Sequence, residues 1–287
     1  MSSIDLIILT YNSAALLPDA VESVRAQSAN SDVTITVIDN ASTDNTLAVA
    51  RDLGIEPIAN PVNVGFAAAV NQAAAIGTGD YVALLNPDAV LGDAKCLEVL
   101  RATLDDQQIG VVGTRMITDG KPYPNGRRFP STTIAARHAV MGVLRPGNTA
   151  SKEYFGEAFG RPDADQVVDW VSGCCLMIRR PLWEEMGGFD TAYWMYLEDA
   201  DLAWRLRQRG YRTVLSGPAW VTHAGGGSSR FRRNKSLWHH HRSAVVFYAR
   251  TRTGWKRLLL PVATVFLGVR LAALIALNTI RRFTARR

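Results

Sequence analysis

The stretch Tyr81-Val82-Ala83-Leu84-Leu85-Asn86-Pro87-Asp88 joins an apolar run to a polar turn. A short apolar run bounded by turn residues indicates a strand that is buried on both faces. Pro87 is typical of a turn, and it leaves Asp88 directly beyond the carboxyl end of the strand. A polar cluster at such a strand end predicts one side of a ligand-binding crevice.

Two earlier segments are built in the same way. The apolar run Ile4–Leu9 precedes Thr10-Tyr11-Asn12, and the β-branched run Val33–Ile38 precedes Asp39-Asn40-Ala41-Ser42. Between and after these runs, apolar residues recur with helical spacing over 14–27, 43–53 and 67–76. Strands that alternate with helices form a parallel sheet, so the three polar clusters should converge at one edge. We therefore predict an α/β fold with a Rossmann-like mixed, mainly parallel sheet flanked by helices.

The second half of the chain is less regular. Residues 113–164 are rich in Gly, Pro and Arg, which predicts loops over the sheet. Further strands are expected at 55–58, within the apolar segment 167–178 and at 211–215, and further helices at 181–186 and 199–209.

Composition limits the class of protein. A chain of 287 residues with 47% hydrophobic and 20% charged residues is typical of a globular protein, with one large α/β domain and an appendix or two modest domains. Three cysteines give no disulfide framework, so Cys96, Cys174 and Cys175 are expected to be small buried residues in a reducing compartment. The first apolar run lacks a basic leader, which favours the cytoplasm.

The C-terminal part is basic, and its charge indicates a polyanionic partner, either nucleic acid or an anionic membrane surface. No interleaved aromatic motif supports nucleic acid. Residues 258–280 are apolar but contain Pro261 and Arg270, so each uninterrupted part is shorter than the roughly 20 residues of a spanning helix. We expect an interfacial helix here, with a tilted transmembrane segment and a core helix as alternatives.

Asp88 is the first candidate for chemistry. A carboxylate beyond a buried strand suits a divalent cation that bridges phosphates, because Mg²⁺ and Mn²⁺ prefer oxygen ligands. The alternative is an aspartate that only caps a turn. Downstream, Asn63-Val64-Gly65-Phe66 opens an alanine-rich helix that contains Asn71. Small residues at that helix start allow a ligand to approach the backbone closely, although alanine-rich helices are common.

Tyr196-Leu197-Glu198-Asp199-Ala200-Asp201 places three carboxylates within four residues. Their mutual repulsion is costly in a purely structural role, but the dipole at a helix start offers a plain explanation. The functional interpretation makes one of them a general base that accepts a proton from a hydroxyl group.

His223 precedes a glycine-rich stretch that ends at Arg230. A lone histidine is usually structural, yet His223 could add a nitrogen ligand beside Asp88, with Arg230 pairing a phosphate. His239-His240-His241 favours a basic surface over a metal site, because consecutive side chains diverge on a helix.

Six motifs follow one another along the chain: Thr10-Tyr11-Asn12, Asp39-Asn40-Ala41-Ser42-Thr43-Asp44, Asn63-Val64-Gly65-Phe66, Asn86-Pro87-Asp88, Glu198-Asp199 and His223. Their order resembles that of family 2 glycosyltransferases of the GT-A fold, over about residues 4–230. A narrower resemblance is to actinobacterial rhamnosyltransferases of the WbbL type. It is carried by residues 123–130, His138-Ala139-Val140-Met141-Gly142, residues 187–201, His240-His241-Arg242-Ser243 and the basic, apolar tail.

The resemblance implies a role for each matching residue. Asp199 takes the position of the catalytic base, with Glu198 and Asp201 as supporting neighbours. Asp88 takes the last position of an Asp-x-Asp element and, with His223, would hold Mg²⁺ or Mn²⁺. Asn86 stands where many members have the first aspartate, so weaker metal binding is expected. Asp39 would read the nucleotide base. The remaining residues implied to contact the nucleotide sugar are Thr10, Tyr11, Asn12, Ser42, Asn63, Gly65, Phe66, Asn71, Asn86, Arg127 and Arg230.

The implied activity is inverting transfer of L-rhamnose from dTDP-L-rhamnose to polyprenyl-diphosphate-linked N-acetylglucosamine, in cell-wall linker synthesis. Residues 1–230 would form the GT-A domain, with a nucleotide-binding half (1–112) and an acceptor and catalytic half (113–230). Residues 231–287 would form a basic helical tail that binds the inner face of the plasma membrane from the cytoplasm. The alternatives are a family 2 enzyme of O-antigen or capsule assembly with another nucleotide sugar, and an inactive membrane-binding module.

Overall fold

The computed structural model describes residues 2–27, 32–129, 161–223 and 233–284. Its first half contains the three predicted strands, β1 (Ser3–Thr10), β2 (Asp32–Asp39) and β4 (Tyr81–Leu85). These strands run parallel, with β1 between β2 and β4. Thr10 lies beside Asp39 in this register, so the polar clusters converge at one edge as predicted. A short edge strand, β3 (Ile58–Ala59), is parallel to β2 and lies at the end of the predicted segment 55–58.

The rest of the main sheet is mixed, with the strand order β3-β2-β1-β4-β11-β6-β12-β5. β11 runs antiparallel between β4 and β6, whereas β6 and β12 are parallel. Strands β7 and β9 extend it beside β6 and β12, and β8 and β10 form a separate pair. The bounds are β5 (Ala89–Leu91), β6 (Ile109–Thr118), β7 (Lys121–Tyr123), β8 (Gly126–Arg127), β9 (Gln166–Val168), β10 (Trp170–Val171), β11 (Cys175–Arg179) and β12 (Arg212–His223).

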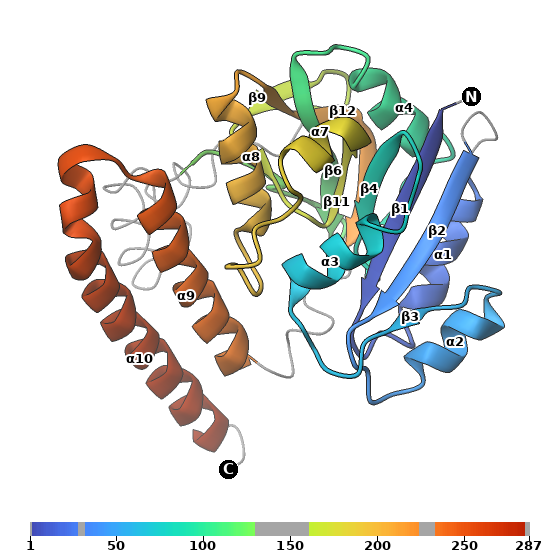
Figure 1. The fold of residues 1–287 in the computed structure, drawn as a ribbon. Coiled ribbons are helices and arrows are strands. Elements are labelled where there is room, and N and C mark those ends of the chain that lie inside the picture. Colours follow the sequence, from blue (N-terminus) through green and yellow to red (C-terminus); the bar gives the residue numbers. More distant parts are fainter. Residues whose placement is uncertain (1, 28–31, 130–160, 224–232, 285–287) are drawn as a thin grey trace.

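Helices cover both faces of the sheet (Figure 1). One core cluster joins Leu6 and Ile8 to apolar side chains of α1 (Leu17–Arg25), α2 (Thr46–Asp52) and α4 (Cys96–Thr103). A second cluster joins Ile7 to α3 (Phe66–Ala74), α7 (Arg180–Glu185) and α8 (Glu198–Gln208). This division follows from the strand period, because successive side chains of β1 point to opposite faces.

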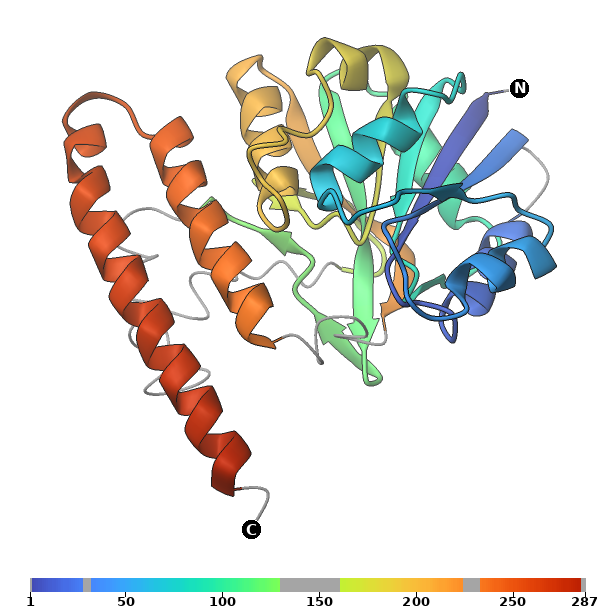
Figure 2. The ribbon, with the colours of Figure 1, turned by 60° about the horizontal axis from the view of Figure 1, so that its bottom comes forward.

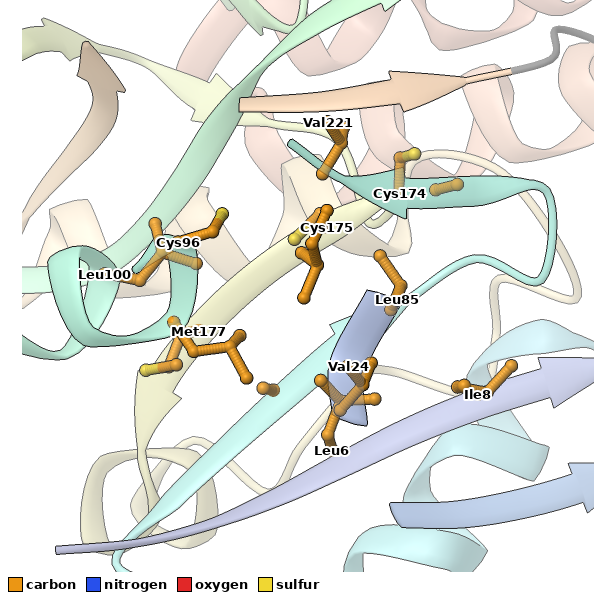
Figure 3. Close-up of a cluster of buried hydrophobic side chains, with 14 of the residues drawn as sticks. Leu6, Ile8, Val24, Leu85, Cys96, Leu100, Cys174, Cys175, Met177 and Val221 are labelled. Atoms are coloured by element: carbon orange, nitrogen blue, oxygen red, sulfur yellow. The ribbon is translucent and has the colours of Figure 1, made fainter. Parts of the chain in front are cut away.

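The three cysteines are buried and free, as expected. Figure 3 places Cys96, Cys174 and Cys175 among apolar core side chains such as Leu85 and Val221. Burial raises the pKa of all three thiols, so none is a reactive thiolate.

The prediction of loops over 113–164 is wrong in part. Residues 113–118 belong to β6, and the chain continues into β7 and β8. Gly113 is required in this strand, because an added Cβ would lie 2.7 Å from the side chain of Val171. The glycine that suggested a loop is therefore a close-packing position within the sheet. Residues 130–160 of the predicted segment lie outside the described residues.

The C-terminal region forms two antiparallel helices at one side of the body, α9 (Arg233–Thr251) and α10 (Leu260–Thr284), joined by a 3₁₀ turn at Gly254–Leu259 (Figures 1 and 2). The inference that Pro261 breaks the apolar tail is wrong. Pro261 lies in the first turn of α10, where a missing N–H costs no hydrogen bond. The segment 254–279 is long and apolar enough to cross a membrane. None of the residues in its most apolar stretch is buried within the protein.

Arg270, the charged residue within the apolar helix, faces α9. Its guanidinium lies 2.7 Å from Nε2 of His241, and the Asn278 amide donates a hydrogen bond of 3.2 Å to the Asn234 side chain. The opposite face of α10 is exposed at Val262, Val265 and Val269, which we call the apolar face. A polar seam toward α9 and an apolar outer face explain why an arginine occurs in this segment.

Candidate active site

A cavity of about 560 Å³ lies over the carboxyl ends of β1, β2 and β4. Its lining comes from both halves of the chain and from α9. Ten predicted site residues line it: Thr10, Tyr11, Asn63, Phe66, Asn86, Asp88, Arg127, Glu198, Asp199 and His223. The convergence inferred from the strand ends therefore holds for residues that lie far apart in the sequence.

Asp39 is buried beneath the cavity, where it ties two loops together. Its carboxylate accepts hydrogen bonds from the Thr10 hydroxyl at 2.9 Å and the Ser42 N–H at 2.8 Å. The Asn12 N–H donates in turn to the Ser42 hydroxyl at 2.8 Å. Asn12 and Ala41 both have positive φ, so the chain bends sharply after each strand. Asp39, Asn12 and Ser42 thus shape the wall, and their contact with a nucleotide stays a prediction.

Asn40 lines the cavity and was missed as a site residue. Its amide donates to the Asn63 side chain and to the Gly65 carbonyl, both at 3.1 Å. Its oxygen accepts the Val64 N–H at 3.0 Å. Asn40 therefore holds the Asn63–Gly65 loop against the end of β2. In the sequence, its position directly after Asp39, at the end of a predicted strand, could have indicated that it is a site residue.

Gly65 brings this loop into contact with the C-terminal half. It has φ 93°, and an added Cβ would lie 2.6 Å from the backbone oxygen of Trp194. The next residue, Phe66, donates its N–H to the same oxygen at 2.7 Å. Glycine is thus required by both the backbone conformation and the close approach.

Asn71 lies on α3 outside the cavity lining, and its amide is used within the protein. It donates to the Phe189 carbonyl at 2.7 Å and accepts the Phe189 N–H at 2.9 Å. Asn71 therefore fixes the segment that leads toward α8. Its implied place at the ribose or diphosphate does not match these contacts.

Asp88 and His223 are brought together by strand pairing. His223 is opposite Ala89 in the β5–β12 register, and its Nε2 lies 3.1 Å from Asp88 Oδ1. Across the described ranges, no group of three or more His, Cys, Asp or Glu side chains could hold a metal. One carboxylate oxygen and one imidazole nitrogen suit a divalent cation that takes its other ligands from phosphates and water. The residues present therefore fit Mg²⁺ or Mn²⁺ bound together with a phosphorylated ligand.

The start of α8 is strained. Tyr196 and Leu197 have φ of 71° and 68°, although neither is glycine. Such conformations cost about 1–3 kcal/mol each and occur mainly where surrounding structure enforces them. Here they turn the chain so that Glu198 and Asp199 reach the cavity. Asp199 accepts the Gly173 N–H at 2.9 Å and the Ala200 N–H at 2.7 Å.

The two carboxyl groups at this helix start differ in their surroundings. Burial raises the pKa of Glu198, and repulsion from Asp199 raises it further. Glu198 Oε2 has no hydrogen-bond partner among the described residues. Burial also raises the pKa of Asp199, but the Gly173 and Ala200 N–H groups and the nearby Arg127 oppose that rise. Asp199 is therefore the group that ionises first, and Glu198 keeps its proton longer.

Asp201 lies behind the cavity wall. It accepts the Tyr193 hydroxyl at 3.1 Å and pairs with Arg205 Nε at 2.7 Å, and both of these bonds anchor α8. Arg127 is near enough to Asp199 to lower its pKa, and its guanidinium lies 5.1 Å from the Trp170 ring centre. The residues Arg230 and His138–Gly142 lie outside the described residues.

The α9 helix forms a wall of the cavity that the sequence analysis did not anticipate. Lys235, Ser236 and His239 line it, and the His239 ring stacks on Trp194 with centres 4.0 Å apart. The prediction of a basic surface is wrong for His239 and His241, which are buried. Further contacts to the body come from the Ser243 hydroxyl, which donates to the Met195 carbonyl at 2.8 Å, and from Phe247 in a small aromatic core.

The pKa of Glu198 gives a test of this environment. A carboxyl group whose pKa is raised on folding stabilises the folded state below its unfolded pKa, near 4.5, and that contribution is lost as the pH rises. Glu198→Gln removes this titration. We expect the stability of the variant relative to the wild type to rise as the pH increases above the unfolded pKa, by at most about 1.4 kcal/mol per pH unit, which is the limit for one titrating group. Denaturant unfolding at several pH values measures this difference.

Glu22→Gln is the matched control, because the Glu22 side chain is 62% exposed and pairs with the neighbouring Arg25 on the surface of α1. Its stability curve should run parallel to that of the wild type. Parallel curves for Glu198→Gln and the wild type would instead show that Glu198 ionises in the folded protein as it does in water.

Comparisons with known proteins agree with this geometry. Residues 5–186 match the model of glycosyl transferase family 2. The chain is 33% identical over 239 residues to the N-acetylglucosaminyl-diphospho-decaprenol L-rhamnosyltransferase of Mycobacterium tuberculosis, covering 78% of this chain and 77% of that protein. It is 31% identical over 189 residues to rhamnosyltransferase WbbL of Escherichia coli, covering 65% of this chain and 68% of that protein.

A solved structure shares the fold. The mannosyltransferase PcManGT from Pyrobaculum calidifontis, in complex with GDP-Man and Mn²⁺, matches with a TM-score of 0.58 and 20% identity, covering 98% of this chain and 80% of that chain. The predicted GT-A fold class is thereby confirmed. From the family model and the identity to the mycobacterial enzyme, we conclude that this chain is a glycosyltransferase and belongs to glycosyl transferase family 2.

Proposed function

We propose that the chain transfers L-rhamnose from dTDP-L-rhamnose to a polyprenyl-diphosphate-linked N-acetylglucosamine, with inversion at the anomeric carbon. The observation that carries the chemistry is that Asp199 and the Asp88–His223 pair line one cavity. A base and a phosphate-binding pair in one cavity are the two requirements of a single displacement from a nucleotide sugar. The choice of sugar and acceptor is supported by the relation to the mycobacterial rhamnosyltransferase.

Asp199 acts as the general base in this proposal. Its carboxylate removes the proton of the acceptor hydroxyl, whose oxygen then attacks the anomeric carbon as the bond to the nucleoside diphosphate breaks. The Gly173 and Ala200 N–H groups fix the orientation of the carboxylate. They also favour its ionised form, which is the form that can accept a proton.

Asp88 and His223 serve the leaving group. They would hold a Mg²⁺ or Mn²⁺ ion, which when bound neutralises charge on the departing diphosphate. Arg127 lines the same cavity and adds a fixed positive charge. The proposed metal accords with the Mn²⁺ in the structure of the mannosyltransferase from Pyrobaculum calidifontis.

The tail would hold the enzyme at the cytoplasmic face of the plasma membrane. If α10 crossed the bilayer while packed along α9, the polar side chains of α9 would enter the hydrocarbon, at a cost of several kcal/mol per unpaired group. An α10 that lies in the interface, with its apolar face toward the lipid, avoids this cost. This arrangement keeps the cavity wall formed by α9 close to the height of a lipid-linked acceptor.

A thermal-shift panel tests the donor and the metal together. dTDP-rhamnose with Mn²⁺ should raise the melting temperature by several degrees at about 100 times Kd, since binding then adds roughly 2.7 kcal/mol. The shift should shrink without Mn²⁺ or with Asp88→Asn. UDP-N-acetylglucosamine and GDP-mannose serve as competing donors. A larger shift with either of them would contradict the proposed donor and favour another family 2 activity.

Asp199→Asn tests the base. The amide cannot accept the proton, so turnover should fall by at least about 10²-fold, while the Kd for dTDP stays close to the wild-type value. Radiolabelled sugar transfer measures turnover, and calorimetry measures binding. Asp52→Asn, at the exposed end of α2 and outside the cavity lining, is the control and should keep wild-type turnover. Normal turnover by Asp199→Asn would remove Asp199 from this role.

Membrane association is tested with the full chain. Val262→Asp, Val265→Asp and Val269→Asp together place charges on the apolar face, so the protein should move from the floating vesicle fraction to the soluble fraction on flotation with anionic vesicles. Ile76→Asp with Val167→Asp changes exposed apolar residues of the body and should leave the distribution unchanged. Deletion after Lys256 should match the triple variant. Continued flotation of both would show that α10 is not the anchor.

A further inference from the structure

His239 is a buried polar residue that the proposed reaction does not use. Its side chain lines the cavity, and the residue is 7% exposed. Neither ring nitrogen has a hydrogen-bond partner within the part of the chain that the structure describes. A buried polar group left without a partner costs about 1–3 kcal/mol. An unpaired histidine facing a cavity therefore points to a ligand that supplies the missing partner.

The surroundings of His239 favour an anionic ligand. Lys235 lies one helical turn earlier on α9, lines the same cavity, and has its Nζ 5.1 Å from the Trp194 ring centre. Burial lowers the pKa of His239, and the positive charges of Lys235 and Arg242 lower it further. The imidazole is thus neutral in the free protein and keeps one N–H to donate. A phosphate oxygen would accept that N–H and pair with the lysine.

The position of Lys235 and His239 on α9 indicates which of the two substrates they bind. The proposed function already assigns the donor diphosphate to Asp88 and His223. Lys235, in contrast, follows Asn234, whose side chain bonds to Asn278 toward the C-terminal end of the apolar helix α10. The polar side chains of α9 that line the cavity therefore lie on the helix that packs against α10, the helix that we assign to the membrane interface. Of the two substrates in the proposed reaction, the acceptor carries its phosphates on a lipid and would approach from the membrane side.

We propose that His239 and Lys235 on α9 bind the diphosphate of the polyprenyl-linked acceptor. This inference rests on the proposed function, because it assigns the second substrate of the same cavity. His239 and Lys235 are binding residues in this account. They hold the acceptor so that its hydroxyl group faces Asp199, and they take no part in proton transfer.

Farnesyl diphosphate is a probe that carries the lipid diphosphate without the sugar. Calorimetry in detergent measures its Kd with wild type, Lys235→Ala and His239→Gln, with farnesol as the ligand control that lacks phosphates. We expect at least a tenfold rise in Kd for each variant and an unchanged Kd for dTDP. His240→Ala and Lys95→Ala are the matched controls, since His240 is an exposed histidine of α9 outside the cavity lining and Lys95 is an exposed lysine directly before α4. Both should bind farnesyl diphosphate like the wild type.

Three outcomes decide the proposal. An unchanged Kd for farnesyl diphosphate in both variants would overturn it. A rise in the Kd for dTDP alone would assign the α9 wall to the donor and would also overturn it. A rise for farnesyl diphosphate alone supports it, and the acceptor KM should then rise with little change in kcat. Because Lys235 is exposed, Lys235→Ala tests the site without disturbing the core.

Binding of farnesyl diphosphate does not depend on the identity of the transferred sugar. If wild type fails to use dTDP-rhamnose while both variants still lose affinity for the probe, the proposed donor fails and the α9 site stands. If transfer succeeds while probe affinity is unaffected by the variants, the function stands and the α9 site fails.

Discussion

The cavity depends on the close contact between Gly65 and Trp194. The Trp194 carbonyl accepts the Phe66 N–H and lies where any side chain on residue 65 would have to go. This contact joins the loop that follows β3 to the segment that precedes α8. Trp194 in turn stacks on His239, so the same residue positions α9. A glycine with positive φ thereby connects three parts of the cavity wall.

The charged groups around the Gly65–Trp194 contact lie in three separate places, each with a different proposed role. The Asp88–His223 pair lies where β4 and β12 end, the Glu198–Asp199 pair lies at the start of α8, and Lys235 with His239 lies on α9. The two carboxyl groups at the start of α8 differ in their neighbours: backbone N–H groups stabilise Asp199 as an anion, whereas Glu198 Oε2 is buried without a hydrogen-bond partner among the described residues. The strained residues Tyr196 and Leu197 directly precede both carboxyl groups and set the direction in which α8 begins.

Local patterns predicted the first half of the site well. The ends of β1, β2 and β4 converge because parallel strands end at one edge, so Thr10, Asp39 and Asp88 could be grouped from sequence. The contacts that were missed are not local. Asn71 is engaged by Phe189, and His239 is buried by Trp194, far away in sequence in both cases. Gly113 and Pro261 misled for a different reason: each usually ends regular structure, but each lies here where its geometry is tolerated.

The central claim concerns the bond that the enzyme makes, and mass spectrometry of the lipid product tests it most directly. Purified protein is incubated with Mg²⁺ or Mn²⁺, dTDP-L-rhamnose and a short-chain prenyl-diphosphate N-acetylglucosamine. The account predicts a lipid heavier by one deoxyhexose residue, carried on the N-acetylglucosamine of the acceptor. An unmodified acceptor, together with transfer from a different nucleotide sugar, would contradict it.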